Sequence, residues 1–391
     1  MAWTLALTAA TGALAFAAVV EPRLLSSPET SGRLAGFCSP LTVTDAATGE
    51  PLRGIEDLVT LPDGSLLLSA QDRWNFASSG DASPSGLYRL PPDWTNLAGI
   101  DGSRPVAARN LTQEIFPVFR PHGIDAIAGE DGSVRVFAVN QAGGSLQSST
   151  AIDVFDLRDE HLSHIVRIDD SRFCQANDLA AIDGQTALVT LDTAACGRVA
   201  NWRELVFGPP AGSVVRLSLP DPEVGEGSDE LQVTPLVTGL RFANGIAIGD
   251  EAVWVAETRG QRLLRLPIEI ASAEAAETGG DNMSSAMRVP LPASPDNLTL
   301  TADGDLLVTQ HPSLLRLAVH RAPWLRLGSS GTRVDRLATG DAEDAEAQLE
   351  WLDPQGRLLS AGTVAAQSPA GLVVGSVTAT GLAWCQDPGQ D

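Results

Sequence analysis

One repeated unit constrains the fold of this chain more than any other feature of its sequence. A polar residue or pair, an alternating apolar strand, an Asp/Gly turn and a second apolar strand recur along the 391 residues. The copies begin at Glu56, His122, Asn177, Asn244, Asp296 and, more weakly, Leu349. Alternation with period two on both sides of an Asp-Gly turn is typical of β-hairpins. Successive copies start roughly 50 to 67 residues apart, which leaves room for four short strands in each.

We therefore expect an all-β fold, a six-bladed β-propeller in one domain over residues 36–387. Repetition around an axis leaves only short, protected sheet edges. Further strands are expected between the hairpins, in the segments GLYRL, TAIDVFDL, GSVVRLSL, RLLRLPI and LLRLAVH. The alternative all-β arrangement is a pair of sandwiches, but it gives no reason for six equivalent units.

The four cysteines are too few for a disulfide scaffold, yet their positions are informative. Cys38 and Cys385 stand at opposite ends of the repeat region, where a closing blade would bring the chain ends together. A disulfide there would hold the ring shut across a loop of several hundred residues. The alternative is two buried free thiols.

The charge balance and the first twenty residues bear on partners and location. Asp and Glu number 49 against 26 Lys and Arg, a net charge of −23, which disfavours binding to phosphate backbones and hence to nucleic acid. Residues 1–20 contain no charged side chain. We interpret them as an uncleaved anchor or an atypical signal, against the alternative of a soluble N-terminus. We therefore expect an extracytoplasmic protein, secreted or anchored to a membrane or lipid surface through this segment.

The polar residues that open the repeats predict a metal site. If each first strand is the innermost of its blade, these residues surround one central opening. They supply mainly carboxylate and amide oxygens, which suit calcium, whereas zinc would want cysteine or several histidines. A single Asn-Asp pair is usually a turn or a cap. Turn chemistry gives no reason for polar residues at the same point of five repeats: Glu56-Asp57, His122, Asn177-Asp178, Asn244 and Asp296-Asn297.

Antiparallel pairing across each turn predicts which side chains lie beside these residues. Asp72 is expected near Glu56, Asn140-Gln141 opposite His122, Asp192 beside Asp178, Glu257 facing Asn244, and His311 facing Asp296. The same pairing places Cys174 beside Cys196, so that a second disulfide is feasible, with free thiols as the alternative.

These residues resemble the serum paraoxonase (arylesterase and lactonase) family from about Cys38 to Cys385. The segments that carry the likeness are GIEDLVTLPDG, FRPHGID, STAIDVFDL, QANDLAAI, RFANGIAI, PDNLTL, the His-Pro at His311, and GTVAAQSPAGLVVGSV. Their order and spacing match throughout.

The resemblance implies a six-bladed propeller with two calcium ions in its central tunnel. The implied ligands of a catalytic ion are Glu56, Asn177, Asn244, Asp296 and Asn297. Those of a structural ion are Asp57, Asp178 and the backbone carbonyl of Ile124. His122 matches the water-activating base, while His311, Phe242, Thr363 and Val377 match the walls of the active site. The cysteines at the two ends match the family's disulfide.

One position departs from the family. The motif Val-Asn-His-Pro, whose histidine supports the catalytic one, reads Val139-Asn140-Gln141-Ala142 here. Gln141 can orient His122 through a hydrogen bond but cannot relay a proton. The expected function is calcium-dependent hydrolysis of small esters or lactones. The alternative is a non-catalytic, calcium-stabilised propeller that binds a ligand or protein at its tunnel mouth.

Overall fold

The computed structural model describes residues 38–386, apart from 75–83, 100–101, 142–149, 198–199, 201–203, 205–209, 221–230, 273–281, 323–327 and 341–346. The hydrophobic segment 1–20, and with it the expected signal or anchor, lies outside the described residues. Among the helices of the described ranges, none is long and apolar enough to cross a membrane.

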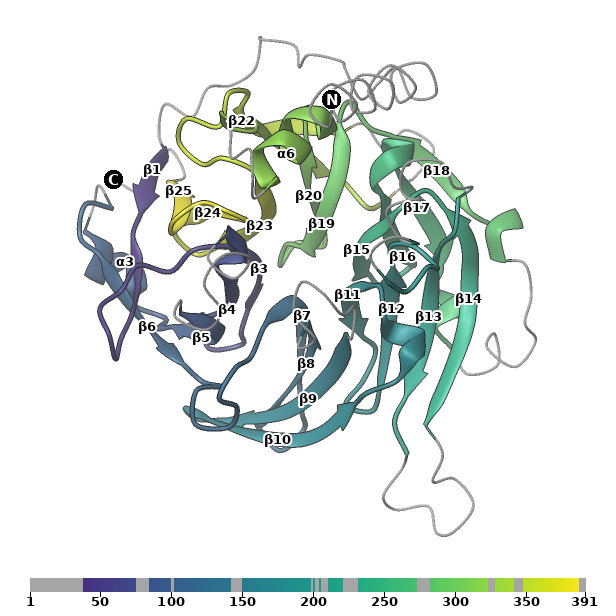
Figure 1. Ribbon diagram of the computed structural model, residues 1–391, viewed down its shortest axis with the longest axis horizontal. Helices are drawn as coiled ribbons and strands as arrows, with labels where there is room; N and C mark the ends of the chain where they lie inside the picture. Colours follow the sequence, from purple (N-terminus) through teal and green to yellow (C-terminus); the bar gives the residue numbers. More distant parts are fainter. Residues whose placement is uncertain are drawn as a thin grey trace, which may run out of the picture.

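The strands form six sheets arranged around a central axis, as expected for a six-bladed propeller (Figure 1). In each sheet, the strand nearest the axis comes first in the following lists. Blade 1 holds β3 (Ile55–Thr60), β4 (Leu66–Gln71), β5 (Ser85–Leu90), β6 (Val106–Asn110) and a short fifth strand, β2 (Val43–Asp45). Blade 2 holds β7 (Pro121–Ala128), β8 (Val134–Asn140), β9 (Ala151–Arg158) and β10 (His161–Ile168). Blade 3 holds β11 (Ala176–Ala181), β12 (Thr186–Leu191), β13 (Gly212–Ser218) and β14 (Gln232–Leu240).

The remaining three blades repeat the same order. Blade 4 holds β15 (Ala243–Ile248), β16 (Ala252–Glu257), β17 (Arg262–Pro267) and β18 (Met287–Pro290). Blade 5 holds β19 (Ser294–Leu300), β20 (Leu306–His311), β21 (Thr332–Leu337) and β22 (Gln348–Asp353). Blade 6 holds β23 (Gly362–Ser368), β24 (Gly371–Ser376), β25 (Leu382–Cys385) and β1 (Cys38–Leu41).

Blade 6 closes the ring because its outermost strand comes from the start of the chain. The strand β1 pairs antiparallel with β25, which places Cys38 directly opposite Cys385. The two cysteines form the expected disulfide. Cys174 and Cys196, which the sequence left open between a disulfide and free thiols, are also bonded.

Two expectations about secondary structure were wrong. The segment from Leu349, taken as the sixth hairpin, instead supplies β22, the outer strand of blade 5, and the inner strand of blade 6 starts at Gly362. Alternation alone does not distinguish an inner strand from an outer one. The segment LLRLAVH forms the helix α6 (Leu314–Arg321), with the Ser313 side chain accepting a hydrogen bond at its N-terminus. Its buried residues Leu317 and His320 are three apart, a helical spacing.

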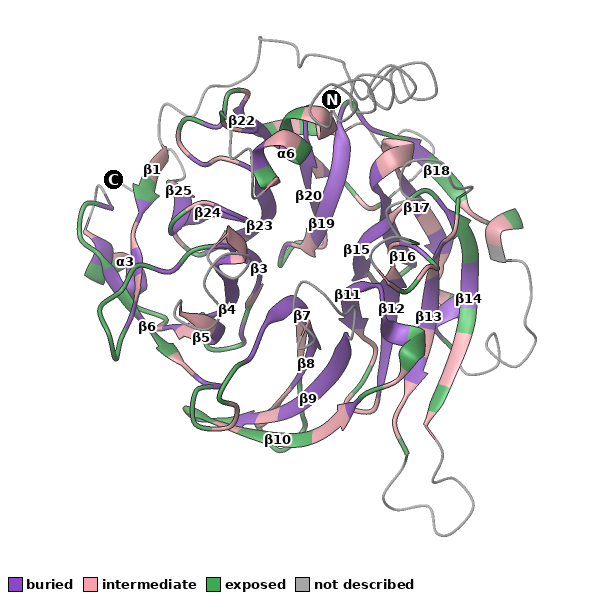
Figure 2. Ribbon diagram, viewed as in Figure 1, coloured by how far each residue is buried: buried purple, intermediate pink, exposed green. Residues whose placement is uncertain are grey.

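The core lies between neighbouring blades, and the strands near the axis are the most completely buried (Figure 2). One cluster joins Ile55 and Leu58 of blade 1 to Val364 and Val373 of blade 6. Burying a side chain such as Leu or Val contributes about 1.5–3 kcal/mol, so the apolar seams hold adjacent blades together.

Every inner strand contains an irregularity at the same place. The pairing register with the second strand of the blade shifts across the polar residues of β3, β7, β11, β15 and β19, and near the start of β23. A regular strand points successive side chains to opposite faces, whereas a bulge changes the direction of one of them. The bulges therefore allow two consecutive polar side chains, such as those of Glu56 and Asp57, both to face the central axis.

Candidate active site on the propeller axis

The six inner strands bring the polar residues of distant repeats together. Hydrogen bonds connect them across blades: the Asn297 side-chain nitrogen donates to the Glu56 carbonyl (3.1 Å), and the Asn244 side-chain nitrogen donates to Asp296 Oδ1 (2.5 Å). Five residues expected at one ion are each no more than 7% exposed: Glu56, Asn177, Asn244, Asp296 and Asn297. The first residues of the inner strands and the ends of the second strands thus form one polar opening.

Three buried amide oxygens in this opening have no hydrogen-bond partner. They are Oδ1 of Asn177, Asn244 and Asn297. The opposite atom of each amide is engaged: Asn244 also donates to Thr258 Oγ1 (3.1 Å), and the Asn177 side chain is hydrogen-bonded to Asp192. A buried acceptor without a donor costs about 1–3 kcal/mol. The arrangement leaves three oxygens free for a ligand that attracts oxygen donors, which fits a hard cation such as calcium.

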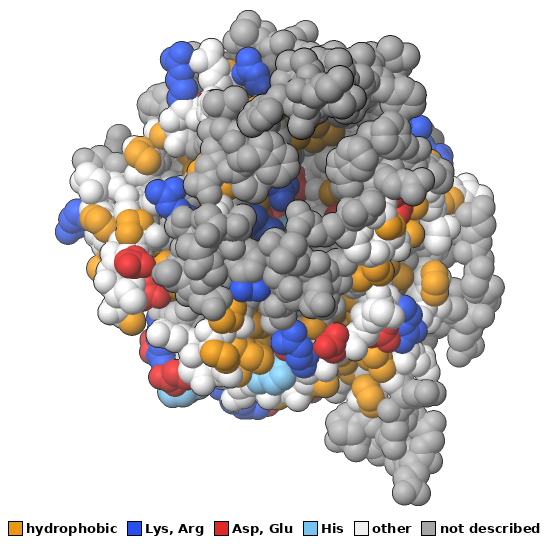
Figure 3. All heavy atoms as spheres, in the orientation of Figure 1, with side chains coloured by type: hydrophobic (Ala, Val, Ile, Leu, Met, Phe, Trp, Pro, Cys, Tyr) orange, Lys and Arg blue, Asp and Glu red, His pale blue; other side chains and the backbone are white. Residues whose placement is uncertain are grey.

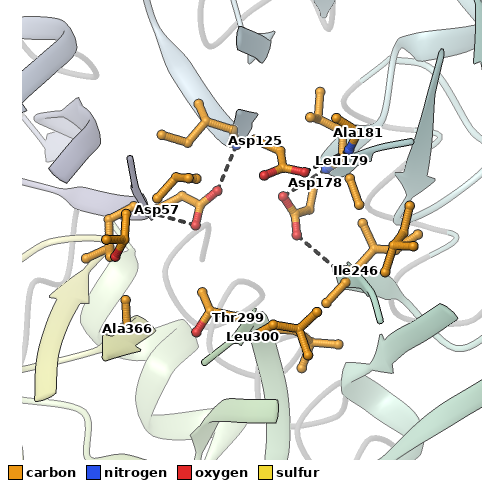
Figure 4. A pocket seen from close by; sticks show the side chains of 17 residues that line it. Asp57, Asp125, Asp178, Leu179, Ala181, Ile246, Thr299, Leu300 and Ala366 are labelled. Atoms are coloured by element: carbon orange, nitrogen blue, oxygen red, sulfur yellow. Dashed lines mark hydrogen bonds between the residues drawn. The ribbon is translucent and has the colours of Figure 1, made fainter. Parts of the chain in front are cut away.

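Asp57 and Asp178 sit further along the inner strands. Asp57 accepts hydrogen bonds from the backbone nitrogens of Leu58 (2.9 Å) and of Ile124 in the next blade (2.7 Å). Asp178 repeats the pattern with Leu179 (2.8 Å) and Ile246 (2.9 Å). Figure 4 shows both carboxylates, with Asp125, at a pocket of about 230 Å³, which Ile124 also lines. Each aspartate therefore joins two blades as well as facing the axis.

These two buried carboxylates lie close to other negative charges. Burial, together with the negative charges of Asp178 and Glu56, raises the pKa of Asp57 well above its usual value. Burial also raises the pKa of Asp178, with Glu56 and Asp125 contributing. In the described part of the chain, no three His, Cys, Asp or Glu side chains cluster in a metal-binding arrangement. In the group around Glu56, three of the expected ligands are asparagines. A pair of carboxylates such as Asp57 and Asp178, with a carbonyl oxygen beside them, also suits calcium.

His122 lies at the edge of this donor set. Its Nδ1 is 2.5 Å from Glu56 Oε2 and 3.0 Å from Arg73 Nη2. Ser69 Oγ donates to the His122 carbonyl oxygen (2.6 Å) and fixes the backbone. Burial lowers the pKa of His122, the Glu56 carboxylate opposes this effect, and Arg73 adds to it. The net lowering of the pKa favours the neutral imidazole, the form that a general base requires.

Arg73 stands between Gln141 and His122. Its Nη1 donates to Gln141 Oε1 (3.2 Å), so Gln141 reaches His122 through this guanidinium. Sequence reasoning missed Arg73, which lies two residues after the end of β4, near the place where Gln141 directly follows β8. The signal that could have revealed Arg73 was its place just after the second strand of its blade, where Gln141 had already been singled out in the next blade.

Of the four residues expected in the walls of the site, His311 and Thr363 contact proposed calcium ligands. His311 Nε2 lies 2.6 Å from Asp296 Oδ2, the contact that strand pairing predicted. Thr363 Oγ1 donates to the Glu56 carbonyl (2.7 Å), and Val377 is buried. Phe242 is partly buried immediately before β15 and has a positive φ of 69°, which is uncommon for a bulky side chain.

The other predicted neighbours are offset along the strands. Asp192, expected beside Asp178, bonds through its backbone to Gln175, and Glu257, expected opposite Asn244, pairs with Ala243. Gln71 bonds through its backbone to Gly54, so that Asp72 is not directly opposite Glu56. The bulges cause these offsets because each adds residues to the inner strand without adding them to its partner.

Comparison with known proteins decides the family. A sequence model of the arylesterase family matches residues 106–386, more than half of the chain. The chain belongs to the arylesterase family. Membership supports a hydrolase of the arylesterase and paraoxonase type.

The sequence identity to individual relatives is low. Serum paraoxonase/arylesterase 2 of Gallus gallus is 25% identical over 273 residues, which cover 68% of each chain. Serum paraoxonase/lactonase 3 of Rattus norvegicus is 23% identical over 275 residues, which cover 68% of this chain and 69% of the relative. Among solved structures, a putative gluconolactonase is 15% identical, with 93% of this chain and 96% of that chain covered and a TM-score of 0.46.

Proposed function

We propose that this arylesterase-family chain is a calcium-dependent hydrolase of carboxylic esters, most of all of lactones. The observation that carries the proposal is the set of three partnerless amide oxygens beside the His122–Glu56 pair. Family membership supports the class of reaction. The word "serum" in the names of both relatives supports an extracytoplasmic location.

Two calcium ions are proposed, each held by a separate group of residues. Glu56, Asn177, Asn244, Asp296 and Asn297 would hold the catalytic ion, and Asp57, Asp178 and the Ile124 carbonyl the structural one. The catalytic ion would polarise the carbonyl group of the substrate and offset the negative charge that develops on its oxygen.

His122 removes a proton from the attacking water. Donation from Nδ1–H to Glu56 leaves the lone pair of Nε2 as the basic site, and burial keeps the ring neutral. A positioned base of this kind contributes about 10²–10⁴-fold to the rate. Arg73 Nη2 lies 3.0 Å from the same Nδ1, a contact between two donors when Nδ1 carries the proton, and Gln141 Oε1 accepts a hydrogen bond from Arg73 Nη1.

The wall residues shape the space where the acyl group sits. Phe242 and Val377 provide apolar surface that excludes water, while Thr363 fixes the Glu56 backbone. His311 is held in place by Asp296.

Hydrolysis of phenyl acetate and a series of aliphatic lactones, with calcium and with a chelator, tests the proposal. We expect turnover with calcium and its loss with chelator, restored when calcium is added back. No calcium-dependent turnover of any of these compounds would contradict the proposal and favour a propeller that binds a ligand or protein at its tunnel mouth.

A further inference from the structure

A buried positive charge lies at the opening of the tunnel, although the chain carries a net charge of −23: Arg73 contacts Glu56 and His122 there. Arg73 follows β4, and Arg321 ends α6. All basic residues of the chain are arginine, so the blue side chains at the central opening in Figure 3 are arginines, next to acidic ones. Their gathering at the proposed active site calls for an anionic partner.

The guanidinium of Arg73 has unused donor capacity. Only 15% of its side chain is exposed, and its buried Nε has no hydrogen-bond partner. Within the described residues, the acidic group in ion-pair range of Arg73 is Glu56, 3.8 Å away. The other two contacts, to Gln141 and His122, bring no negative charge when the imidazole is neutral.

Glu56 is also a proposed ligand of the catalytic ion. A carboxylate committed to a divalent cation no longer balances the charge of Arg73, and Asp296, the other acidic group at this opening, is a proposed ligand as well. Arg321 adds a second positive charge that acts on Arg73 and on Glu56. An anionic group near Arg73 would offset its buried positive charge.

We propose that this site prefers esters and lactones that carry a carboxylate substituent, which Arg73 binds through its free N–H groups. The inference rests on the proposed hydrolytic function and specifies its substrate class. The planar fork of arginine matches a carboxylate in geometry as well as in charge.

The kinetic test compares phenyl acetate with 4-acetoxybenzoate, which is the same acetyl ester with a carboxylate on the ring. We expect a higher kcat/KM for the anionic ester, and Arg73→Met should reduce this preference about tenfold. Arg73→Lys should retain part of it. Arg109→Met removes an exposed charge from β6, in the outer part of blade 1, and should leave the preference unchanged. An equal fall for both esters in Arg73→Met would overturn the proposal.

A binding measurement separates failure of this inference from failure of the proposed function. Calorimetric titration of the calcium-loaded protein with benzoate and with neutral benzamide should show tighter binding of benzoate, which Arg73→Met weakens about tenfold. Benzoate binding that depends on Arg73, without turnover of either ester, would support the anion site and reject the hydrolase. Turnover of both esters without preference, and benzoate affinity unaffected by Arg73→Met, would reject the anion site alone.

Discussion

At the scale of single residues, the axis combines groups that are costly to bury unless something binds them. The amides of Asn244 and Asn297 direct nitrogen toward protein acceptors and leave oxygen unpartnered. Asp57 and Asp178 have raised pKa values because their charges are buried close together. A cation at each place would remove the penalty, so binding and folding should be coupled.

His122→Gln tests the proposed base. Glutamine can still donate to Glu56, so calcium affinity should stay nearly constant, while kcat should fall by about 10²–10⁴-fold. Calcium titration followed by calorimetry, together with lactonase kinetics, measures both quantities. His161→Gln, an exposed histidine on β10, is the control. An unchanged kcat in His122→Gln would remove this residue from the mechanism.

Asp178→Ala and Asn297→Ala should separate the two proposed ions. Asp178→Ala should lower the Tm and abolish its rise with calcium, a stabilisation of about 2.7 kcal/mol at calcium hundredfold above Kd. Asn297→Ala should instead reduce turnover by more than about tenfold, with a smaller effect on stability. Thermal melts across a calcium titration, with turnover assays, measure these effects.

Asp125→Ala provides a matched control for Asp178→Ala. Asp125 makes the same kind of bonds, to the backbone nitrogens of Ala126 and of Ala181 in the next blade, but is not a proposed ligand. Its loss should lower the Tm without removing the calcium response. If Asp178→Ala responds to calcium as the parent does, the structural ion has been placed wrongly.

At the scale of elements, the bulges of the inner strands bring neighbouring blades into very close contact. Gly245 in β15 lies between Asn244 and Ile246, against the backbone of blade 5. A Cβ atom there would be 2.5 Å from the Asp296 carbonyl oxygen and 2.6 Å from Asn297 Cα. The close approach that positions these proposed ligands therefore depends on a residue without a side chain.

Gly245→Ala should consequently destabilise the protein by about 1–3 kcal/mol, because backbone must move to make room. It should also weaken calcium binding, since the displaced residues are Asp296 and Asn297. Gly184→Ala is the control: an added Cβ meets nothing within 4 Å there. Urea denaturation of both variants checks the difference, and equal stability would show that the blades can separate without cost.

At the scale of the whole molecule, the fold is a ring whose ends are joined covalently. The Cys38–Cys385 disulfide spans 347 residues, whereas Cys174–Cys196 spans 22. The entropy that a cross-link removes from the unfolded chain grows with the length of the loop it closes.

Removal of the ring-closing disulfide in Cys38→Ala/Cys385→Ala should therefore cost more stability than Cys174→Ala/Cys196→Ala. The chain-entropy relation gives about 5–6 kcal/mol for the first and about 3 kcal/mol for the second. Denaturant unfolding of the two double variants measures both. A larger loss of stability in Cys174→Ala/Cys196→Ala would mean that packing between blades, rather than closure of the long loop, holds the chain ends together.

The positions of Cys38 and Cys385 predicted the closing disulfide. The sequence by itself determined the number of blades and the polar residues at the start of five inner strands. These features follow from alternation, turn residues and repetition, which are properties of short segments. Only the tertiary structure decided the bulges, the helical state of α6, the true start of blade 6 and the place of Arg73 between Gln141 and His122. Each of these depends on which strand or loop from elsewhere in the chain packs against the segment, and packing across blades overrides local pattern.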